Sequence, residues 1–310
     1  MLGEIKTVEL RKIWKNEAYD FTPWLTQNLE EIGKAIGLEL EFEDSEVSVG
    51  PYSADILAKD TGTDQYVIIE NQLEKTNHDH LGKCITYASV LDASTVIWIA
   101  SRFTEEHKKA LDWLNDHTSE KIGFYGIKVE LWQIDNSQPA VKFNVISSPN
   151  EIVKQAAKRK EQGELTPTRK TQLEFWTTFR DKLAETGKIR SLQTPRPQYW
   201  FDIALGKSGV HLSNTFNTDK NEIGTRVYIG NKKVDEWLPY FETKKETIEA
   251  KLENKLQWNP NPDNRDKVIT LTKQFNLEDK ENWEEAINWL VKETIKFKEV
   301  FSRMIKEKTA

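Results

Sequence analysis

Two carboxylates and an amide lie near the ends of two short apolar segments early in the chain. Asp55 belongs to SADILAKD (53–60), while Glu70 and Gln72 belong to QYVIIENQ (65–72). Each segment has the length and the apolar content of a β-strand. The second segment is apolar on both faces until Glu70, which indicates a buried strand that ends on an acid. In α/β sheets the ends of buried strands are common positions for active-site residues.

The spacing of these segments predicts a β-hairpin in which the two acids face one another. Residues 61–64, TGTD, have the length of a hairpin loop. If Asp60 faces Gln65, the same register places Asp55 directly opposite Glu70. Directly opposite residues on antiparallel strands have Cβ atoms about 5 Å apart. Two carboxylates at that distance repel each other unless a proton or a cation lies between them.

The donor atoms around this pair favour a hard divalent cation. Gln72 lies two residues after Glu70 and therefore projects from the same face of the strand. The carboxylates of Asp55 and Glu70, with the backbone carbonyl of Asn71, offer the oxygen ligands that Mg²⁺ or Mn²⁺ prefers. Such a cation keeps water molecules that can be activated, and it attracts phosphate. The chemistry predicted for the site is therefore metal-assisted hydrolysis of a phosphodiester.

Alternating strands and helices surround the hairpin in the first half of the chain. Thr22 as the N-cap and Pro23 at the first helical position begin a helix that Gly37 ends. The predicted elements are strands at 8–14, 39–47, 53–60, 65–72, 95–101 and 123–134, and helices at 22–36, 80–91 and 105–117. Strands separated by helical crossovers predict an α/β fold, in which helices cover both faces of a mixed sheet.

The second half of the chain predicts a smaller α+β domain. Residues 150–168 are polar and helical, with breaks near Gly163 and Pro167, which is typical of a connector. Three antiparallel strands follow at 199–206, 209–214 and 225–231, and helices are expected at 233–256 and 283–308. The predicted domains are residues 1–149, the connector 150–168, and residues 169–310.

Composition limits the class of protein. The 310 residues carry a net charge of −6, which argues against strong non-specific binding of nucleic acid by the whole surface. No apolar run approaches the ~20 residues that span a bilayer, and the N-terminal MLGEIKTVELRKIW lacks the apolar region of a signal peptide. Cys84 is the single cysteine, so neither an intramolecular disulfide nor a cysteine-based zinc cluster can form. We expect a cytoplasmic protein without a membrane partner.

The arrangement of Asp55 and Glu70-Asn71-Gln72 on a hairpin, after a helix and before a helix and a strand, resembles the PD-(D/E)XK nuclease superfamily. The resemblance implies a restriction-endonuclease-like core in which Asp55 and Glu70 bind Mg²⁺. The third motif residue, usually lysine, helps to position the attacking water in that superfamily. Gln72 stands at this position, as in some restriction endonucleases with a Glu-x-Gln motif, and Ala54 stands where the name-giving motif has proline. Glutamine cannot supply a positive charge, so this departure bears on the catalytic rate.

A narrower resemblance covers more of the chain. The segments FTPWLTQNLEEIG, VGPYSADILAKD and VIIENQLEKTNHDHLGKCITYASVLDA resemble an uncharacterised bacterial family with a restriction-endonuclease-like front half. Its back half is a domain of unknown function, and the resemblance extends over residues 170–305 through FW, RVYIGN and KLENKLQW.

Several further residues are candidates for the site. Lys83 shares a helix face with Tyr87, and in related nucleases a lysine or glutamine of this helix often reaches the scissile phosphate. His78 and His80 stand where that helix begins and either contact phosphate or accompany a cap formed by Asp79 or Thr76. The candidates are Lys83 as a catalytic residue, Glu31 as a further metal ligand, and Asn28, His78, His80 and Tyr87 as nucleic-acid contacts.

Three functions remain open from the sequence. The first is a Mg²⁺-dependent endonuclease that cuts DNA, with RNA not excluded, in restriction or phage defence. It would act as a homodimer, because cutting both strands needs two sites, and a regulatory partner could belong to the same defence system. The second is an inactive module that keeps the nuclease fold and binds nucleic acid or an effector. The third is a sensor in which the second domain binds a small signal molecule.

Overall fold

The computed structural model describes residues 3–119, 121–149, 166–218, 220–277 and 279–309. Within them the chain forms two compact units. The first unit holds the elements from β1 to β7, and the second holds those from α7 to α10 together with the short segments 37–39 and 61–64. Each unit builds its own hydrophobic core.

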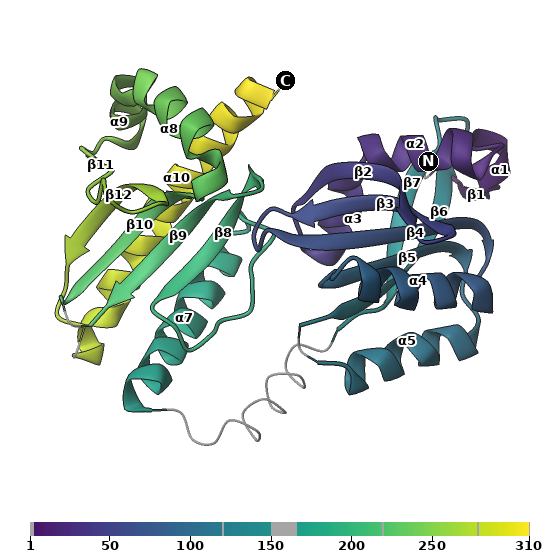
Figure 1. Ribbon diagram of the computed structural model, residues 1–310, viewed down its shortest axis with the longest axis horizontal. Coiled ribbons are helices and arrows are strands. Elements are labelled where there is room, and N and C mark those ends of the chain that lie inside the picture. Colours follow the sequence, from purple (N-terminus) through teal and green to yellow (C-terminus); the bar gives the residue numbers. More distant parts are fainter. Residues whose placement is uncertain (1–2, 120, 150–165, 219, 278, 310) are drawn as a thin grey trace. The chain divides into compact units, whose positions relative to one another are not determined.

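A mixed sheet of seven strands, counted over the described residues, forms the centre of the first unit (Figure 1). The strands are β1 (Ile5–Val8), β2 (Leu40–Val49), β3 (Tyr52–Asp60), β4 (Gln65–Lys75), β5 (Thr95–Arg102), β6 (Gly123–Ile134) and β7 (Ala140–Ser147). They lie in the order β1-β6-β5-β4-β3-β2, and β7 pairs with β6. Strands β4, β5 and β6 are parallel, whereas β2, β3 and β4 are antiparallel. The prediction of a mixed α/β sheet is confirmed.

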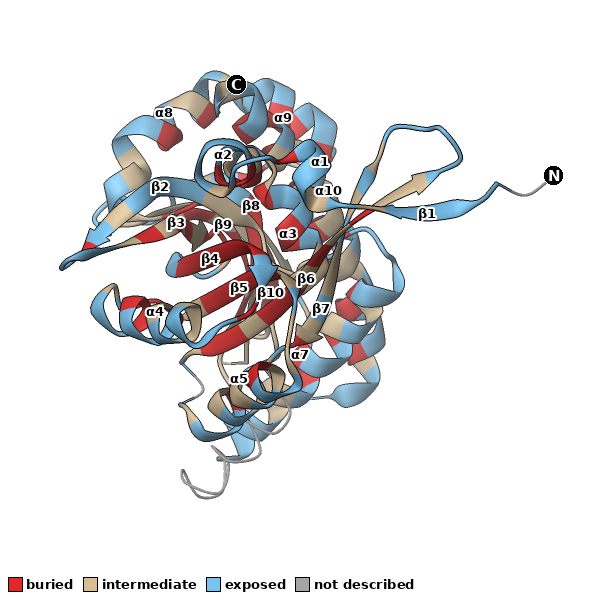
Figure 2. Cartoon of the chain, turned by 90° about the vertical axis from the view of Figure 1, so that its right-hand side faces the viewer, coloured by how far each residue is buried: buried red, intermediate tan, exposed pale blue. Residues whose placement is uncertain are grey.

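Helices cover both faces of this sheet. Helices α4 (His78–Val90) and α5 (Glu105–His117) pack on one face, where Cys84 and Leu111 meet Trp98. The opposite face is covered by the π-helix η1 (Glu17–Phe21) and by α2 (Thr22–Gln27) and α3 (Leu29–Ile36). Strands β4 and β5 are therefore buried on both sides, as Figure 2 shows by their red colour. This burial explains why their sequences lack the alternation of a half-exposed strand.

The β3–β4 hairpin has the predicted register. Asp60 faces Gln65 and Ile56 faces Ile69, where the regular pairing ends, so Asp55 and Glu70 are the residues directly beyond the last facing pair. The turn is made possible by Asp64, whose φ of 59° lies in the left-handed region that Asp tolerates better than most residues. Glu70 lies within the buried stretch Val67–Leu73, because β4 continues to Lys75 and does not end on the acid as the sequence predicts.

The predicted strand at 8–14 is wrong. Strand β1 ends at Val8, and residues Leu10–Ile13 form the short helix α1 instead. Trp14 explains the difference, because its ring is buried against Phe21 and Trp24 at centroid distances of 4.7 Å and 4.9 Å. This packing bends the chain inward and overrides the β propensity of the segment.

The predicted helix at 22–36 is split in two. Thr22 does not cap a helix: its hydroxyl donates to Asn71 Oδ1 at 3.1 Å, and it lies in the first turn of α2. Asn28 interrupts the helix, because its side-chain amide donates to the carbonyl of Trp24 and competes with the backbone ladder. Gly37 ends α3 with a φ of 75°, as predicted.

The second unit is an antiparallel sheet backed by helices. Its strands are β8 (Trp200–Lys207), β9 (Val210–Asn217), β10 (Glu222–Ile229), β11 (Gln257–Trp258) and β12 (Lys267–Gln274), in the order β11-β12-β10-β9-β8. Its helices are α7 (Pro167–Glu185), the 3-10 turn η2 (Asn231–Lys233), α8 (Val234–Thr243), α9 (Lys245–Leu252), the 3-10 turn η3 (Lys280–Asn282) and α10 (Trp283–Thr309). Aromatic side chains of α7 and α10 pack on one face of the sheet.

Two predictions for the second half need correction. The helix expected at 233–256 is divided at Lys244 and ends at Glu253, whose φ of 57° is left-handed. Strand β12, with its β-branched run Val268–Thr270, was missed altogether, and so was β7 in the first unit. The connector predicted at 150–168 lies outside the described residues up to 165. Among the described helices, none has the length and apolarity that crossing a membrane requires.

Candidate active site

Asp55 and Glu70 face each other across the β3–β4 hairpin. The backbone N–H of Asp55 donates to Glu70 Oε1 at 3.4 Å, which ties the end of β3 to the side chain on β4. Glu70 is fully buried, and its Oε2 has no hydrogen-bond partner among the described residues. An oxygen of a buried carboxylate without a partner is costly unless a proton or a cation satisfies it. This oxygen is therefore the first feature that points to a ligand.

Asn71 fixes the position of Asp55. Its backbone N–H and its side-chain Nδ2 both donate to Asp55 Oδ2, at 2.8 Å and 2.7 Å. The hydroxyl of Thr22 in turn donates to Asn71 Oδ1 at 3.1 Å, so the amide is held at both ends. The carboxylate of Asp55 is thus oriented by its partners before any ligand binds.

Burial shifts the protonation of both acids. Burial raises the pKa of Glu70 to about 8, and the nearby charge of Asp55 acts in the same direction. Burial also raises the pKa of Asp55 to about 6, although the hydrogen bond from Asn71 acts the other way. Without a cation the pair therefore holds a proton near neutral pH. A divalent ion would replace that proton and let both oxygens act as ligands.

Helix α4 brings a lysine to the pair. The positive charge of Lys83 lowers the pKa of both Asp55 and Glu70, so its ammonium group lies close enough to act on them. Its nearest acidic partner is Asp79, one turn earlier, at 3.9 Å. This distance is loose for an ion pair, which leaves the ammonium group free to contact a bound phosphate.

Tyr87 has a different place from the one predicted. We expected a contact with nucleic acid, but its side chain is fully buried in a hydrophobic cluster with Ala54 and Ile68. Burial, followed by the charges of Glu70 and Asp55, raises the pKa of Tyr87 to about 12. Its hydroxyl has no hydrogen-bond partner among the described residues, as is true of Glu70 Oε2. Tyr87 is therefore close enough to both acids for their charges to act on it.

Glu17 is an acidic residue of the site that the sequence did not reveal. It lies in η1, and its Oε2 accepts a hydrogen bond from the backbone N–H of Leu73 at 2.5 Å. Its negative charge raises the pKa of both Asp55 and Glu70, which places it beside them. The only local signal is the acid just after Asn16, whose side chain caps this helix.

Glu31 and Asn28, which were predicted to join the site, have other partners. The carboxylate of Glu31 accepts a hydrogen bond from Lys34 at 2.7 Å on the surface of α3. Asn28 donates to the carbonyl of Trp24 at the break between α2 and α3. Of these two acids, Glu17 therefore lies close enough to act on Asp55 and Glu70, whereas Glu31 pairs with Lys34.

Gln72 lies beside Glu70, but both ends of its amide are occupied. Its Oε1 accepts from the indole Nε1 of Trp98 at 3.0 Å, and its Nε2 donates to the carbonyl of Lys75 at 2.8 Å. The strand register pairs Trp98 with Glu70, which is consistent with the predicted common face. In this arrangement Gln72 holds the end of β4 in place, and positioning water would require one of these bonds to open.

The two histidines at the start of α4 differ in their surroundings. Asn77 caps the helix, so neither Asp79 nor Thr76 takes that role. His78 Nδ1 lies 3.0 Å from His107 Nε2, so one proton joins the two rings. His80 Nδ1 lies 3.0 Å from the cap Asn77. Burial and the charge of Lys83 lower the pKa of His80.

The residues present fit a cation that takes its remaining ligands from water and substrate. Among the described residues, no three His, Cys, Asp or Glu side chains form a ready-made metal cage. The available donors are the carboxylates of Asp55 and Glu70 with the backbone carbonyl of Asn71. Mg²⁺ is commonly bound by one or two carboxylates and keeps several waters. The unpartnered Glu70 Oε2 agrees with this kind of site.

Comparisons with known proteins match only parts of the chain. The sequence model of a domain of unknown function, DUF4268, matches residues 171–305, which is less than half of the chain. A comparison with curated proteins found no match. One solved structure, described as "Structure of EndoMS-dsDNA2 complex", is similar at 17% identity and a TM-score of 0.28. The similarity covers 35% of this chain and 43% of that one, so this chain spans less than half of that protein's length.

Proposed function

We propose that the chain is a metal-dependent nuclease that hydrolyses phosphodiester bonds in DNA at the Asp55–Glu70 site. The observation that carries the proposal is the pair itself: two neighbouring acids on a hairpin, with one oxygen of the buried Glu70 unpartnered among the described residues. The fold expected from the resemblance to PD-(D/E)XK nucleases adds support, because it places its acids at the same kind of position.

The chain's own residues have separate roles in this proposal. Asp55, Glu70 and the carbonyl of Asn71 would hold Mg²⁺ or Mn²⁺, which supplies a polarised phosphate and an activated water when bound. Asn71 keeps Asp55 oriented through its two hydrogen bonds. Lys83 offers the positive charge that Gln72 lacks, and its ammonium group would stabilise charge on the phosphate oxygens.

The biological setting is also part of the proposal. We infer a role in restriction or phage defence from the family resemblance, with a homodimer as the form that cuts both strands. A regulatory partner from the same system would then control when the nuclease acts. The net charge of −6 is compatible with this, because the contact with DNA would be confined to a site that a cation makes attractive.

A second candidate function is an inactive module that binds nucleic acid or an effector. The hydrogen bonds that occupy both ends of Gln72 favour it, because they remove the third motif residue from the reacting centre. Such a module would bind DNA in a salt-dependent way without cutting it.

Cleavage of supercoiled plasmid and of single-stranded DNA tests the proposal. The purified chain is incubated with Mg²⁺, Mn²⁺ or EDTA and compared with Asp55→Asn and Glu70→Gln. We expect metal-dependent cutting that falls at least about 100-fold in both variants, because each removes a charged ligand. Asp116→Asn and Glu105→Gln on the exposed side of α5 are matched controls and should cut like the wild type.

Two outcomes would contradict the nuclease. Cutting that persists in Glu70→Gln would come from a contaminant or from another site. Absence of cutting under every metal, together with salt-dependent binding of the same DNA, would select the inactive module. Calorimetric titration of Mn²⁺ into wild type and Glu70→Gln distinguishes a metal site without activity from no metal site.

A further inference from the structure

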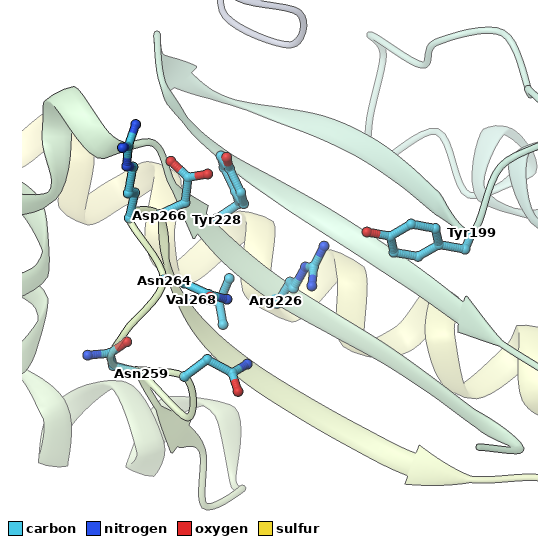
Figure 3. A pocket seen from close by; sticks show the side chains of 9 residues that line it. Tyr199, Arg226, Tyr228, Asn259, Asn264, Asp266 and Val268 are labelled. Carbon is cyan, nitrogen blue, oxygen red and sulfur yellow. The ribbon is translucent and has the colours of Figure 1, made fainter. Parts of the chain in front are cut away.

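The second unit carries a polar pocket that the Asp55–Glu70 site does not explain. Its volume is about 360 Å³, within the ordinary range for small-molecule sites. It lies over strands β10 and β12 and is bounded by the loop 259–266 and by Tyr199 before β8 (Figure 3). The pocket belongs to the segment matched by the domain of unknown function.

The sheet of this unit has one apolar and one polar face. The buried side chains of Phe201, Leu212 and Val227 lie on the face that packs against helices α7 and α10. The residues that alternate with them point to the opposite face of the sheet. On that second face the register aligns Asp202, Ser213 and Arg226 in one row across β8, β9 and β10. A polar face of this kind suits recognition of a ligand, because the backing helices already supply the hydrophobic core.

Arg226 is the central charge of the pocket. Its Nε is buried and has no hydrogen-bond partner among the described residues. Asp202 lies two strands away in the same row, about 9.5 Å between backbones at the usual strand spacing. Asp202 Oδ1 is likewise without a hydrogen-bond partner among those residues, and His211 Nε2 lies 3.8 Å from it. A buried N–H group without a bonded partner is costly, and an anionic ligand on this partly exposed guanidinium would relieve that cost.

Hydrogen bonds build the pocket wall before a ligand arrives. The ammonium group of Lys267 donates to the carbonyls of Pro262 and Asn264, both at 2.6 Å. The backbone N–H of Asn259 donates to the carbonyl of Val268 at 2.9 Å, and Asp266 Oδ1 accepts from the backbone N–H of Asn231 at 2.8 Å. The loop is therefore anchored at both ends and in its middle.

Two tyrosines lie on either side of Arg226, as Figure 3 shows. Tyr199 is half exposed, so its ring offers a surface that a flat ligand can cover. Tyr228 stacks on His211 at a centroid distance of 4.9 Å, which fixes its ring. Burial, with the neighbouring carboxylate of Asp266, raises the pKa of Tyr228 to about 12, so its hydroxyl stays protonated.

These groups match the chemistry of a nucleoside phosphate. Arg226 and Arg265 provide the guanidinium groups that bind phosphate in a bidentate way. The amides of Asn259 and Asn264 provide donors and acceptors for the edge of a base, and the tyrosines provide stacking surfaces. A dicarboxylate would match the arginines but would leave the amides and the rings without a role.

We propose that this pocket binds a nucleoside phosphate, with the phosphate on Arg226 and the base near Tyr199. The ligand is either a free nucleotide or one nucleotide of a nucleic-acid strand, since both present the same group. The proposal concerns a site of its own and does not rest on the nuclease activity proposed for the first unit.

Calorimetric titration of the full chain tests this proposal. The probes are the common ribonucleoside and deoxyribonucleoside 5′-monophosphates, inorganic phosphate, unphosphorylated nucleosides and a short single-stranded DNA. We expect at least one nucleotide or the strand to bind, and Arg226→Gln to weaken that binding about 10-fold or more. The matched control is Arg303→Gln, because Arg303 is exposed on α10 and pairs only with Glu307 among the described residues. The titrations are carried out in EDTA, which removes the cation of the proposed nuclease site and separates this test from that of the nuclease.

The source of the ligand follows from the relative affinities. Tighter binding of a mononucleotide than of the strand assigns the pocket to a free nucleotide, and the reverse order assigns it to a strand. If Arg226→Gln proves unfolded by its thermal transition, Tyr199→Leu replaces it, because Tyr199 is 50% exposed and its loss leaves the core intact. Tyr199→Leu should weaken binding about 10-fold through lost stacking.

Three results would overturn the proposal. The first is no binding of any nucleotide or strand at millimolar concentration. The second is inorganic phosphate binding as tightly as every nucleotide, which would leave no role for the base. The third is wild-type affinity in both Arg226→Gln and Tyr199→Leu, which would place the ligand elsewhere on the chain.

Discussion

The chemistry proposed for the first unit depends most on Glu70, because its carboxylate is wholly buried and only one of its oxygens is bonded within the described part of the chain. Asp55 is oriented by Asn71 and so has less freedom to adapt to a ligand. Lys83 stands nearby as the cation, while Glu17 adds a third negative charge from the opposite helical layer. The balance of these charges decides whether the site holds a proton or a metal ion.

Glu17 and Glu31 provide a direct test of which acid of the first helical segment serves the site. Glu17→Gln should lower metal-dependent cleavage about 10-fold or more, because it removes a charge that acts on both Asp55 and Glu70. Glu31→Gln should cut like the wild type, since its carboxylate pairs with Lys34 on the surface. Initial cleavage rates with Mg²⁺, at equal protein concentration, give the comparison. A loss of activity in Glu31→Gln with none in Glu17→Gln would restore the prediction from sequence.

Asp55, Glu70 and Glu17 differ in how far the sequence determines their positions. Asp55 and Glu70 could be paired because a short hairpin loop fixes the register locally. Glu17 could not be found, because its position depends on a π-helix and on its hydrogen bond to Leu73, 56 residues away in sequence. Gln72 was correctly placed beside Glu70, but its bond to Trp98 depends on a neighbouring strand and was not foreseeable.

The β3–β4 hairpin is the element whose stability should depend on the protonation of the site. The elements around it were predictable where periodicity was strong, as in α5 and β6, whose bounds match the sequence pattern. Prediction failed where packing or a side-chain bond overrode the local pattern, as at Trp14 and at Asn28. The hairpin was predictable from its pattern, but β propensity does not reveal that Glu70 is buried beside Asp55, which makes the stability of the hairpin depend on pH.

In metal-free protein the stability of this hairpin should fall as pH rises. The ordinary pKa of Glu70 is 4.5, and burial raises it to about 8 in the folded state. Since the folded protein binds this proton more tightly, its contribution to stability is complete below pH 4.5 and is lost as pH rises toward 8. Between pH 5 and pH 8 the wild type should therefore lose at least about 1.4 kcal/mol more unfolding free energy than Glu70→Gln, which cannot ionise.

Thermal unfolding in EDTA across this pH range, for wild type and Glu70→Gln, measures the difference. Glu105→Gln is the control, because Glu105 is exposed at the start of α5 and should leave the wild-type pH dependence unchanged. Mg²⁺ should restore stability at pH 8 in the wild type alone, since a cation stabilises the ionised pair. Parallel pH profiles for wild type and Glu70→Gln in EDTA would show that the folded protein does not bind this proton more tightly.

At the scale of the whole molecule, two hydrophobic cores correspond to two ligand sites of different chemistry. The core of the second unit is formed entirely by residues from Phe175 onward, whereas the hydrophobic clusters of the first unit contain no residue after Phe143. The acids lie on the first unit and the arginine pocket on the second. Each unit can thus be stabilised by its own ligand, because a ligand that binds only the folded form raises the free energy of unfolding of what it binds.

Differential scanning calorimetry of the full chain should therefore resolve two transitions that respond to different ligands. Mg²⁺ should raise one of them, and only while Glu70 is intact; a nucleotide that binds the pocket should raise the other, and only while Arg226 is intact. Glu70→Gln and Arg226→Gln are each other's controls, since each should abolish one shift and preserve the second. A single transition that both ligands raise would mean that the two cores unfold together. In that case binding at the arginine pocket would also stabilise the folded form of the metal site, and a nucleotide would be able to influence the nuclease through that linkage.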